Sequence, residues 1–556
     1  MNELNNLLFN NLKKIIQEIS SENIEIIIER PKQEPNAHLS TSIALSSAKK
    51  MNKKPREIAE IIKQKLEETN NYKEITIAGP GFINVLFNDD LVQNVIKTVM
   101  LQKEKFGSSP KKNFIFNLEE VSANPTGFLH VGHARNAAIS DSTARILKFA
   151  GYEVQTEYYI NDAGNQINIL AITILYNYQL LLNKKVETPE EIYGGDMYIE
   201  VAKKFVDKYG DKFIDCTWSE NKINNEETAK IFKEESTNYF LAIIKDQLKL
   251  FNVSIDFWSS EKKSIEENQI EKMLKKYAEL GAAYKKDGAV WLKTTDLGDD
   301  KDRVLIKSNG DYTYITPDLA THHERIQRSK ANKLVNFWGG DHHGYIVRMC
   351  AGLALLGHPQ DILDIDMIQM VRLVKDGQEY KMSKRKGTAV WLIDLLEMVG
   401  PDALRYMLAS KNPASHMDFD LDLVTAKNSS NPVFYAQYAT ARIANILIQA
   451  EKNNIKPSAT NLSLLTNSKE LQMMITLDLF NKNVESAAKS RLPHIITEYI
   501  QTLTKQFHSY YAEKDIKIVD LNNIELSSQR ITLIKALEQV FSNSFNLIGI
   551  SVVEQM

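Results

Sequence analysis

The stretch NFIFNLEEVSANPTGFLHVGHARNAAISDSTARILKFAGYEV, residues 113–154, decides the fold. It begins as an apolar strand, continues through a polar loop into a helical pattern, and stops at Gly151 before a second strand pattern, EVQTEYYI. A strand, a helix and a second strand in this order form a βαβ unit, which requires a parallel sheet. The sequence therefore predicts an α/β fold with a doubly wound parallel sheet.

The segments on either side of this unit indicate two further domains. Residues 1–20 and 54–69 have helical spacing, and residues 23–30 and 73–88 have strand character, which predicts a small α+β unit ending at the GSSP linker. After about residue 400 the strand signal vanishes and helical periodicity dominates. The predicted domains are 1–110 (α+β), 111–397 (the parallel sheet, with a helical insertion around 166–285) and 398–556 (all-α). Within the middle domain, further strands are expected at 289–293, 303–307, 312–315 and 333–338.

Composition excludes several classes of protein. The chain has 556 residues, with 68 Lys and Arg against 71 Asp and Glu, and 43% of its residues are hydrophobic. This is an ordinary soluble composition, and no apolar run is long enough to span a membrane. Two cysteines, Cys216 and Cys350, cannot build a disulfide framework or a four-cysteine zinc site. With no signal-peptide pattern at the start, we expect a cytoplasmic protein. A net charge of −3 does not exclude a local RNA-binding surface.

The first chemical motif is HVGH, which opens the helix after the first strand. His130 and His133 are three residues apart, so both imidazoles can face the same phosphate oxygens near the positive end of the helix. Gly132 between them would let a flat base approach the backbone. Alone the motif is weak, because an isolated HxxH is usually incidental and lacks a third metal ligand here.

The second motif is the basic stretch KMSKRKG, which contains Lys381, Met382, Ser383 and Lys384. Such a loop can bind a polyphosphate, although a basic cluster on its own is usually a solvated surface. HVGH lies on the first strand–helix turn and KMSKRKG after the last strands, where a doubly wound sheet places its nucleotide ligands. Neither GxxxxGK[ST] nor GxGxxG occurs, which argues against a P-loop protein and against a dinucleotide-binding protein.

These motifs resemble those of a known family. HVGH resembles the HIGH motif and KMSKR the KMSKS motif of class I aminoacyl-tRNA synthetases. The segments EYYINDAGNQ, DYTYITPD, PDALRY and NPVFYAQYATARI further resemble arginyl-tRNA synthetases, and the resemblance covers essentially the whole chain. Val131, Arg385 and Pro317 depart from the usual pattern without threatening the resemblance.

The resemblance implies a Rossmann-type catalytic domain that charges tRNA-Arg in two steps. L-Arginine first reacts with ATP to give arginyl-adenylate and pyrophosphate, and the terminal ribose of tRNA then accepts the arginyl group. His130, His133, Lys381 and Lys384 would stabilise charge on the departing pyrophosphate. Mg²⁺ would be held largely by ATP oxygens and water. Members of the family are usually monomers, and their adenylation step typically requires bound tRNA.

The resemblance also assigns an arginine pocket. Glu119 and Asp318 would hold the guanidinium, Tyr314 would lie against it, and Asn124 would bind the α-amino or carboxylate end. The residues are compatible with this, since a guanidinium is always charged and needs carboxylates. Tyr314 and Asp318 are four apart, one helical turn if a helix begins after Thr313. Without the resemblance, each acid would be interpreted as a surface residue.

The glycine-rich segment GGDHHG follows a predicted strand and adds two candidates. Asp-His-His also occurs in manganese-dependent phosphoesterases, but those enzymes need further Asp and His clusters that are missing from this sequence. The preferred interpretation is a turn in which Gly340 and Asp341 approach ATP.

Contacts to RNA are expected from both flanking domains. Tyr435 and Arg442 lie on one face of a C-terminal helix and suit unstacked bases, although a tyrosine stripe is more often core packing. Phe82, in the PGFIN turn, is an RNA-facing aromatic or, equally, a buried one.

Two other functions stay open at this point. One is a class I synthetase for another amino acid, which would need a different pocket. The other is a catalytically inactive relative that binds RNA, which the intact HVGH and KMSK residues argue against.

Overall fold

The computed structural model describes residues 3–31, 37–340, 343–380, 390–458 and 460–556. The chain forms two compact units. The first contains residues 1–110, 149–151 and 427–556, and the second contains residues 111–148 and 152–426.

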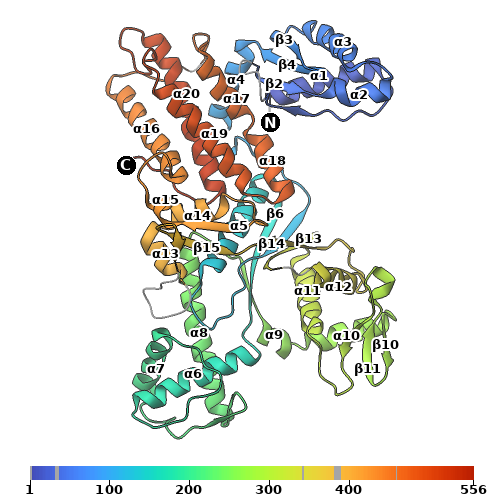
Figure 1. Ribbon diagram of the computed structural model, residues 1–556, viewed down its shortest axis with the longest axis vertical. Helices are drawn as coiled ribbons and strands as arrows, with labels where there is room; N and C mark the ends of the chain where they lie inside the picture. The colour runs from blue at the N-terminus through green and yellow to red at the C-terminus, as the bar shows by residue number, and fades with distance from the viewer. Residues whose placement is uncertain (1–2, 32–36, 341–342, 381–389, 459) are drawn as a thin grey trace. The chain divides into compact units, whose positions relative to one another are not determined.

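A five-stranded sheet organises the second unit (Figure 1). Its strand order is β14-β13-β5-β6-β9, and every pairing in it is parallel. The strands are β5 (Ile115–Glu119), β6 (Glu153–Ile160), β9 (Phe257–Ser260), β13 (Lys333–Gly339) and β14 (Leu363–Ile368). The predicted doubly wound parallel sheet is therefore confirmed.

The strand order reverses between β5 and β13. From β5 the chain adds β6 and β9 on one side of the sheet, and then returns to add β13 and β14 on the other. Ligands of such sheets bind in the crevice at the carboxyl ends of the two strands that flank the reversal. In this chain those ends are Glu119 of β5 and Gly339 of β13.

Three helices stand next to this crevice. Helix α5 (Val131–Phe149) follows β5, as predicted, while α11 (Ile315–Ser329) precedes β13 and α12 (His343–Ala354) follows it. Leu319 of α11, Leu334 of β13 and Met349 of α12 are all fully buried in one hydrophobic cluster. The packing of α11 and α12 against β13 therefore fixes the side chains that they present to the crevice.

The insertion after β6 is helical, but it is shorter than predicted. Its helices are α6 (Asn165–Leu181), α7 (Asp196–Tyr209) and α8 (Glu226–Leu250), with a small hairpin of β7 (Trp218–Ser219) and β8 (Lys222–Ile223). They enclose an aromatic core that includes Tyr178, Phe232 and Phe240. Strand β9 lies inside the range 166–285 yet belongs to the parallel sheet. A four-residue edge strand between charged helices has too little periodicity to be recognised in the sequence.

The strands expected at 289–293 and 303–307 belong to a sheet of their own, together with an additional strand at 283–286. The antiparallel order is β10-β11-β12. The expected strand at 312–315 is wrong, because Tyr312 makes only an isolated bridge and α11 begins at Ile315. These strands are β10 (Ala283–Lys286), β11 (Ala289–Leu292) and β12 (Arg303–Ile306).

The remaining elements of this unit include a third sheet and several short helices. A third sheet has the order β16-β15-β17. Residues 398–426 cluster with this unit rather than with the C-terminal helices. The elements are α9 (Glu261–Glu266), α10 (Gln269–Glu279), β15 (Val371–Lys375), β16 (Gln378–Glu379), α13 (Leu392–Val399), α14 (Pro401–Ala409), β17 (Met417–Asp420) and α15 (Leu421–Thr425).

The first unit combines the two ends of the chain. Its N-terminal part is an antiparallel sheet, β1-β2-β4-β3, with four helices, and its C-terminal part is helical. The amphipathic helix predicted at 1–20 is confirmed as α1, whereas 23–30 contains only a two-residue strand. The N-terminal elements are α1 (Glu3–Ile19), β1 (Ile28–Glu29), β2 (Leu39–Thr41), α2 (Ile43–Met51), α3 (Pro55–Glu67), β3 (Tyr72–Ala78), β4 (Phe82–Phe87) and α4 (Asp89–Gln102). The C-terminal helices are α16 (Pro432–Lys452), α17 (Ser468–Asp478), α18 (Phe480–Ser490), α19 (His494–Tyr511) and α20 (Ile524–Leu547).

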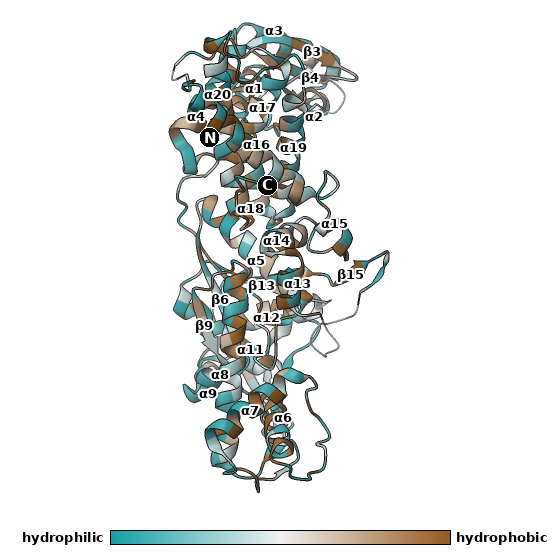
Figure 2. Ribbon diagram, turned by 90° about the vertical axis from the view of Figure 1, so that its left-hand side faces the viewer, coloured by the Kyte–Doolittle hydropathy of each residue, from teal (hydrophilic) through white to brown (hydrophobic). Residues whose placement is uncertain are grey.

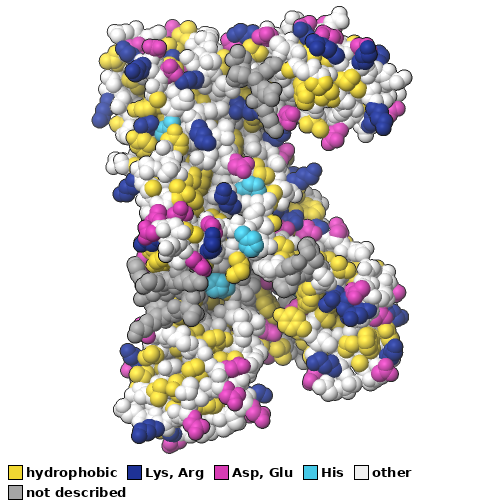
Figure 3. All heavy atoms as spheres, in the orientation of Figure 1, with side chains coloured by type: hydrophobic (Ala, Val, Ile, Leu, Met, Phe, Trp, Pro, Cys, Tyr) yellow, Lys and Arg dark blue, Asp and Glu magenta, His cyan; other side chains and the backbone are white. Residues whose placement is uncertain are grey.

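Hydrophilic and hydrophobic residues are mixed along the helices (Figure 2) and on the face drawn in Figure 3. Figure 2 shows hydrophilic and hydrophobic residues alternating along the helices, and none of the described helices is long and apolar enough to cross a membrane. On the face drawn in Figure 3, basic and acidic side chains are interspersed. This agrees with a net charge close to zero.

Candidate active site

A cavity of about 770 Å³ lies at the carboxyl ends of β5 and β13. Six of the residues predicted from the sequence line it, namely Glu119, His130, Gly132, His133, Tyr314 and Asp318. The other lining residues are Val121, Ser122, Val131, Asn136, Tyr159, Asn161, Glu261, Pro317, Thr321, His322, Asn336, Phe337, Trp338, Gly339, Tyr345, Ile368, Gln369, Met370 and Val371.

Hydrogen bonds within the HVGH segment fix the protonation of both histidines. The Gly132 amide donates to Nδ1 of His130 (3.0 Å), and the His130 amide donates to Nδ1 of His133 (3.3 Å). A neutral imidazole with Nδ1 as acceptor carries its proton on Nε2. Burial lowers the pKa of His130, and burial together with His130 lowers the pKa of His133 to about 3. At neutral pH both rings are therefore uncharged Nε2–H donors, stacked with centroids 3.7 Å apart.

A side chain at position 132 would crowd the ring of His130. A Cβ at this position would lie 2.9 Å from Cε1 of His130, closer than real Cβ contacts occur. The sequence predicts close approach of a nucleotide base to Gly132. The structure adds that the His130 ring also leaves little room for a side chain at this position.

The amide groups at the start of α5 are largely occupied. The Val131 amide donates to the Val390 carbonyl (3.2 Å), and the Leu392 amide donates to the Leu129 carbonyl (2.6 Å). His130 and Trp391 form an antiparallel bridge. The free helix N-terminus expected for phosphate binding is therefore partly used by the chain itself. The same bonds place residues 390–392, which follow KMSKRKG in sequence, directly beside HVGH.

A strained loop forms the wall between β5 and α5. Val121 and Ser122 both have positive φ angles, 65° and 43°, which is rare for a β-branched residue such as valine. Asn136 holds the loop in place, since its Oδ1 accepts from the Val121 amide (3.0 Å) and its Nδ2 donates to the Phe337 carbonyl of β13 (2.8 Å). Backbone strain of this kind persists only where surrounding contacts enforce it, and it is commonly found at functional sites.

Asp318 supplies a half-buried carboxylate at the start of α11. The Tyr345 hydroxyl donates to its Oδ2. Burial raises the pKa of Asp318, and the bond from Tyr345 opposes this rise. Tyr314, which is 81% exposed, lies one helical turn before Asp318 at the cavity mouth, with its ring centroid 6.3 Å from that of Tyr345. The arrangement suits a flat cation that stacks on a ring and pairs with an acid.

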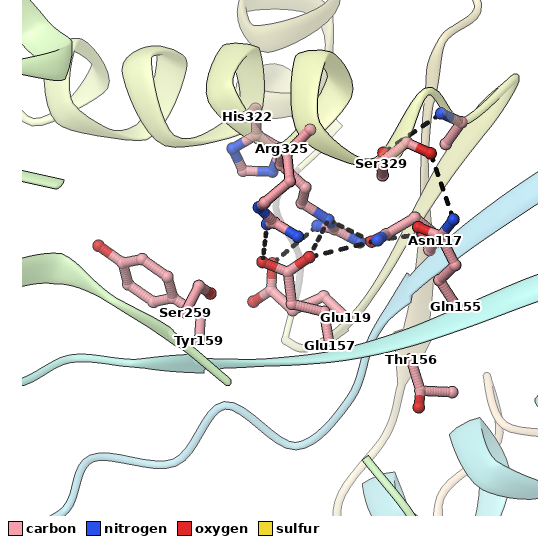
Figure 4. A network of polar contacts seen from close by, with 12 residues as sticks. Asn117, Glu119, Gln155, Thr156, Glu157, Tyr159, Ser259, His322, Arg325 and Ser329 are labelled. Carbon is pink, nitrogen blue, oxygen red and sulfur yellow. Dashed lines mark hydrogen bonds and ion pairs between the residues drawn. The ribbon is translucent and has the colours of Figure 1, made fainter. Parts of the chain in front are cut away.

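Glu119 is paired with an arginine of the chain (Figure 4). Its Oε2 accepts from Nη1 of Arg325 (3.0 Å). Burial raises the pKa of Glu119, and the Arg325 charge opposes this rise. No local pattern predicts this pairing, because the two residues are 206 positions apart.

Glu261 is a third carboxylate in the wall that sequence reasoning missed. It directly follows β9, so the unrecognised strand hid its position at the sheet end. Its Oε2 is buried without a hydrogen-bond partner. Burial raises its pKa, as do the neighbouring carboxylates Asp162 and Asp318. The cavity is thus acidic on this side and offers neutral donors on the HVGH side.

Other predicted residues are not brought into this cavity. Asn124 and Gly340 are not among its described lining residues, although Gly340 directly follows β13. The predictions for Asp341, Lys381, Met382, Ser383 and Lys384 lie outside the described residues.

The predicted RNA-contacting residues lie in the first unit. Tyr435 is half-buried and stacks on His508 with centroids 4.2 Å apart. The guanidinium of Arg442 lies 4.2 Å from the ring centroid of Tyr438 and 4.6 Å from that of Tyr511. Its Nη1 donates to Nδ1 of His508 (3.0 Å), so its planar faces are already used by protein aromatics. Phe82 begins β4 and is half-buried.

Three sequence models of protein families match the chain. They are the arginyl tRNA synthetase N terminal domain (residues 2–87), the tRNA synthetases class I (R) catalytic domain (95–449) and the DALR anticodon binding domain (436–556). An arginine–tRNA ligase of Mesoplasma florum is 55% identical over 548 residues, covering 98% of this chain and 99% of that protein. The arginine–tRNA ligase of Bacillus subtilis is 41% identical, covering 96% and 94%. The arginyl-tRNA synthetase structure of Thermus thermophilus shares the fold, with a TM-score of 0.77 at 20% identity, over 99% of this chain and 100% of that one.

A doubly wound sheet with an HVGH turn at its switch point, followed by a helical DALR domain, defines a class I aminoacyl-tRNA synthetase. With close relatives matched along nearly their full length, the specificity also follows. The chain belongs to the arginyl-tRNA synthetase family and is a ligase that uses ATP.

Proposed function

We propose that the cavity binds arginine on its acidic side and the ATP phosphates on its HVGH side. Glu119, Asp318 and Glu261 surround the arginine, and Tyr314 covers its guanidinium. His130, Gly132 and His133 face the nucleotide. The supporting observation is the pairing, within one 770 Å³ cavity, of half-buried carboxylates with two neutral imidazole donors.

The first reaction joins arginine to the nucleotide. The arginine carboxylate attacks the α-phosphorus of ATP, and pyrophosphate leaves with the electrons of the broken P–O bond. The Nε2–H groups of His130 and His133 donate to phosphate oxygens as negative charge develops there. Because both imidazoles are held neutral and oriented before substrate binds, little reorganisation is needed in the transition state. Removal of one such donor typically costs about 3 kcal/mol, or about a hundredfold in rate.

The second reaction transfers the arginyl group to tRNA-Arg. The terminal ribose 2′-OH attacks the activated carbonyl, and AMP leaves. We assign Lys381 and Lys384 to the phosphates and Asn124 to the α-amino or carboxylate end of arginine, on the family resemblance. Gly340 and Asp341, with Met382 and Ser383, are assigned to ATP on the same ground. Tyr435, Arg442 and Phe82 are assigned to tRNA.

Magnesium enters this proposal as a companion of ATP. Among the residues that the structure describes, no group of three or more His, Cys, Asp or Glu side chains is placed to hold a metal ion. Mg²⁺ keeps several waters and binds readily to phosphate oxygens, so ATP itself supplies the fitting ligands. Mg²⁺ would neutralise phosphate charge there. We also place the enzyme in the cytoplasm, where its two free cysteines remain reduced, and expect a monomer.

Arginine-dependent exchange of radiolabelled pyrophosphate into ATP tests the proposal. We expect exchange with arginine and tRNA-Arg together, much less without tRNA, and none with lysine in place of arginine. Exchange with lysine would overturn the pocket assignment. Absence of exchange under every condition would instead support the inactive RNA-binding alternative.

A further inference from the structure

Arg325 lies at the centre of a buried polar network beneath the cavity (Figure 4). Its side chain is 2% exposed and comes from the face of α11 that also carries Asp318. Its Nε donates to Asn117 Oδ1 (2.5 Å), and its Nη2 donates to the Asn117 carbonyl (3.0 Å). Two further bonds from Nη1 reach Glu119 Oε2 (3.0 Å) and Asn336 Oδ1 (2.7 Å). The planar guanidinium is therefore held in one orientation by side chains of two strands.

The network reaches Asp318 as well. Asn336 Nδ2 lies 2.9 Å from Nε2 of His322, and Nδ1 of His322 lies 2.8 Å from the Asp318 carbonyl. A carbonyl can only accept, so His322 carries its proton on Nδ1 and accepts from Asn336 at Nε2. Burial lowers the pKa of His322, which keeps it neutral. A continuous chain of bonds thus runs from Arg325 through Asn336 and His322 to the backbone of Asp318.

The charges below the cavity also depend on Arg325. Glu157 lies beside Glu119 on the adjacent strand and interacts with both Arg325 (3.6 Å) and Arg328 (2.7 Å). Burial alone would raise the pKa of Glu157, but the two arginines outweigh burial and lower it. Without Arg325, the carboxylates of Glu119 and Glu157 would lie side by side while Arg328 paired with Glu157, and one of them would tend to take up a proton. A protonated Glu119 would no longer attract a cationic substrate.

We propose that Arg325 is a positioning residue that sets arginine specificity, because it orients Glu119 directly and Asp318 through Asn336 and His322. The inference rests on the proposed function of the cavity. Arg325 does not touch the substrate. It occupies one oxygen of Glu119 and thereby fixes the direction of the carboxylate that meets the substrate guanidinium.

The test is Arg325→Lys in the full-length enzyme, assayed by pyrophosphate exchange with tRNA-Arg. Lysine keeps the charge but cannot bond to Asn117, Glu119 and Asn336 at once. We expect the KM for arginine to rise about tenfold or more, as for one misplaced charged hydrogen bond, while the KM for ATP stays within about twofold. A merely structural role would change both constants together or lower only the amount of folded enzyme.

Arg328→Lys is the matched control. Arg328 lies one turn further along α11 and pairs with Glu157 and Glu324, but it does not line the cavity. We expect its KM for arginine to be unchanged. An equal rise in both variants, or no rise with Arg325→Lys, would overturn the inference.

Two more variants keep the inference testable. If Arg325→Lys fails to fold, as judged by circular dichroism, Asn117→Ser decides, because it removes the Oδ1 acceptor of the Arg325 Nε bond without changing any charge or any lining residue. A severalfold rise in the KM for arginine supports the inference, and an unchanged KM overturns it. In addition, Arg325→Lys should have a smaller effect in Glu119→Gln than in the unaltered enzyme, because Glu119 is the carboxylate that Arg325 orients directly. Fully additive effects would contradict the inference.

The inference and the proposed function fail differently. If the unaltered enzyme shows no arginine-dependent exchange, the proposed function is wrong. If the unaltered enzyme is active and the variants behave as their controls do, only the role of Arg325 is wrong.

Discussion

The imidazoles of HVGH enter the cavity as donors because their other nitrogens are already bonded to the chain. The acceptor at Nδ1 in each ring is satisfied by a backbone amide of the same four-residue segment. Protonation of either ring would break that bond, which agrees with the lowered pKa values of His130 and His133. The spacing of the motif therefore keeps both imidazoles neutral and also directs both side chains toward the cavity.

We predict that Tyr345 influences how arginine binding changes with pH. Asp318 must be ionised to pair with a guanidinium, and burial raises its pKa while the Tyr345 hydrogen bond holds it down. Tyr345→Phe should raise the pKa of Asp318 further, so that acidification protonates it at a higher pH. We expect the KM for arginine to rise on lowering the pH in both proteins, and to begin rising at higher pH in the variant. Pyrophosphate exchange between pH 5.5 and 8, a range chosen to cover ordinary carboxyl and histidine titrations, measures this. Coincident profiles would show that Tyr345 has no such effect.

A site residue could be predicted from the sequence only where a short segment around it forms a recognisable motif. The histidines of HVGH are three residues apart, and Tyr314 and Asp318 are four apart, so each pair lies within one helical turn. The structure brings both pairs to one cavity. Arg325 and Glu261 have no local signal. Arg325 acquires its role from Glu119, far away in sequence, and Glu261 acquires its role from a strand too short to recognise. The strain at Val121 likewise arises only when β5, α5 and β13 are assembled.

At the scale of elements, α11 is the main support of the acidic side. Asp318, His322 and Arg325 follow one another at helical spacing and face the cavity or the network beneath it. The position of this helix therefore decides the geometry of the pocket. Glycine at position 352 of α12 lets the two helices approach closely, because a Cβ there would lie 2.5 Å from Cδ2 of Leu319.

We predict that Gly352→Ala lowers the free energy of unfolding relative to Gly344→Ala by about 1–3 kcal/mol, the usual cost of overpacking. Both substitutions lie in α12 and gain helix propensity, but a Cβ at Gly344 meets only the end of Arg348 at 3.8 Å. Urea unfolding followed by fluorescence gives the comparison. Equal stabilities would mean that Leu319 moves aside at no cost.

The sheet was predictable at this scale and its edges were not. Long apolar runs gave β5, β6 and β13, whereas β9 and the separate β10-β11-β12 sheet depend on pairing partners that the sequence does not reveal. The pattern at 312–315 predicts a strand, but α11 begins at Ile315 in the structure.

At the scale of the whole molecule, the first unit is built from both ends of the chain. The Leu4 amide donates to Asp478 Oδ1 (3.4 Å), and the Gln93 side chain donates to the Leu465 carbonyl (3.2 Å). Asn543 of α20 donates to the carbonyls of Lys103 (3.0 Å) and Phe106 (3.1 Å). The N-terminal domain and the C-terminal helices therefore share buried polar bonds.

We predict that Asn543→Ala costs about 1–3 kcal/mol, because it leaves buried carbonyls without donors. Hydrogen exchange of the α4 and α20 amides should become faster in both helices together. Asn453→Ala, at an exposed position after α16, is the control and should change stability by less than about 0.5 kcal/mol. Faster exchange in α20 alone would show that the two ends are not coupled through this residue.

The union of the two ends has a consequence for synthesis on the ribosome. The N-terminal domain emerges first, but α17 and α20, which complete its unit, follow more than three hundred residues later. At about 5–20 residues per second, the surface of α4 waits roughly 20–90 s for its partners. During that interval the nascent domain exposes apolar residues that the finished enzyme buries, so a holdase chaperone would find its binding site there.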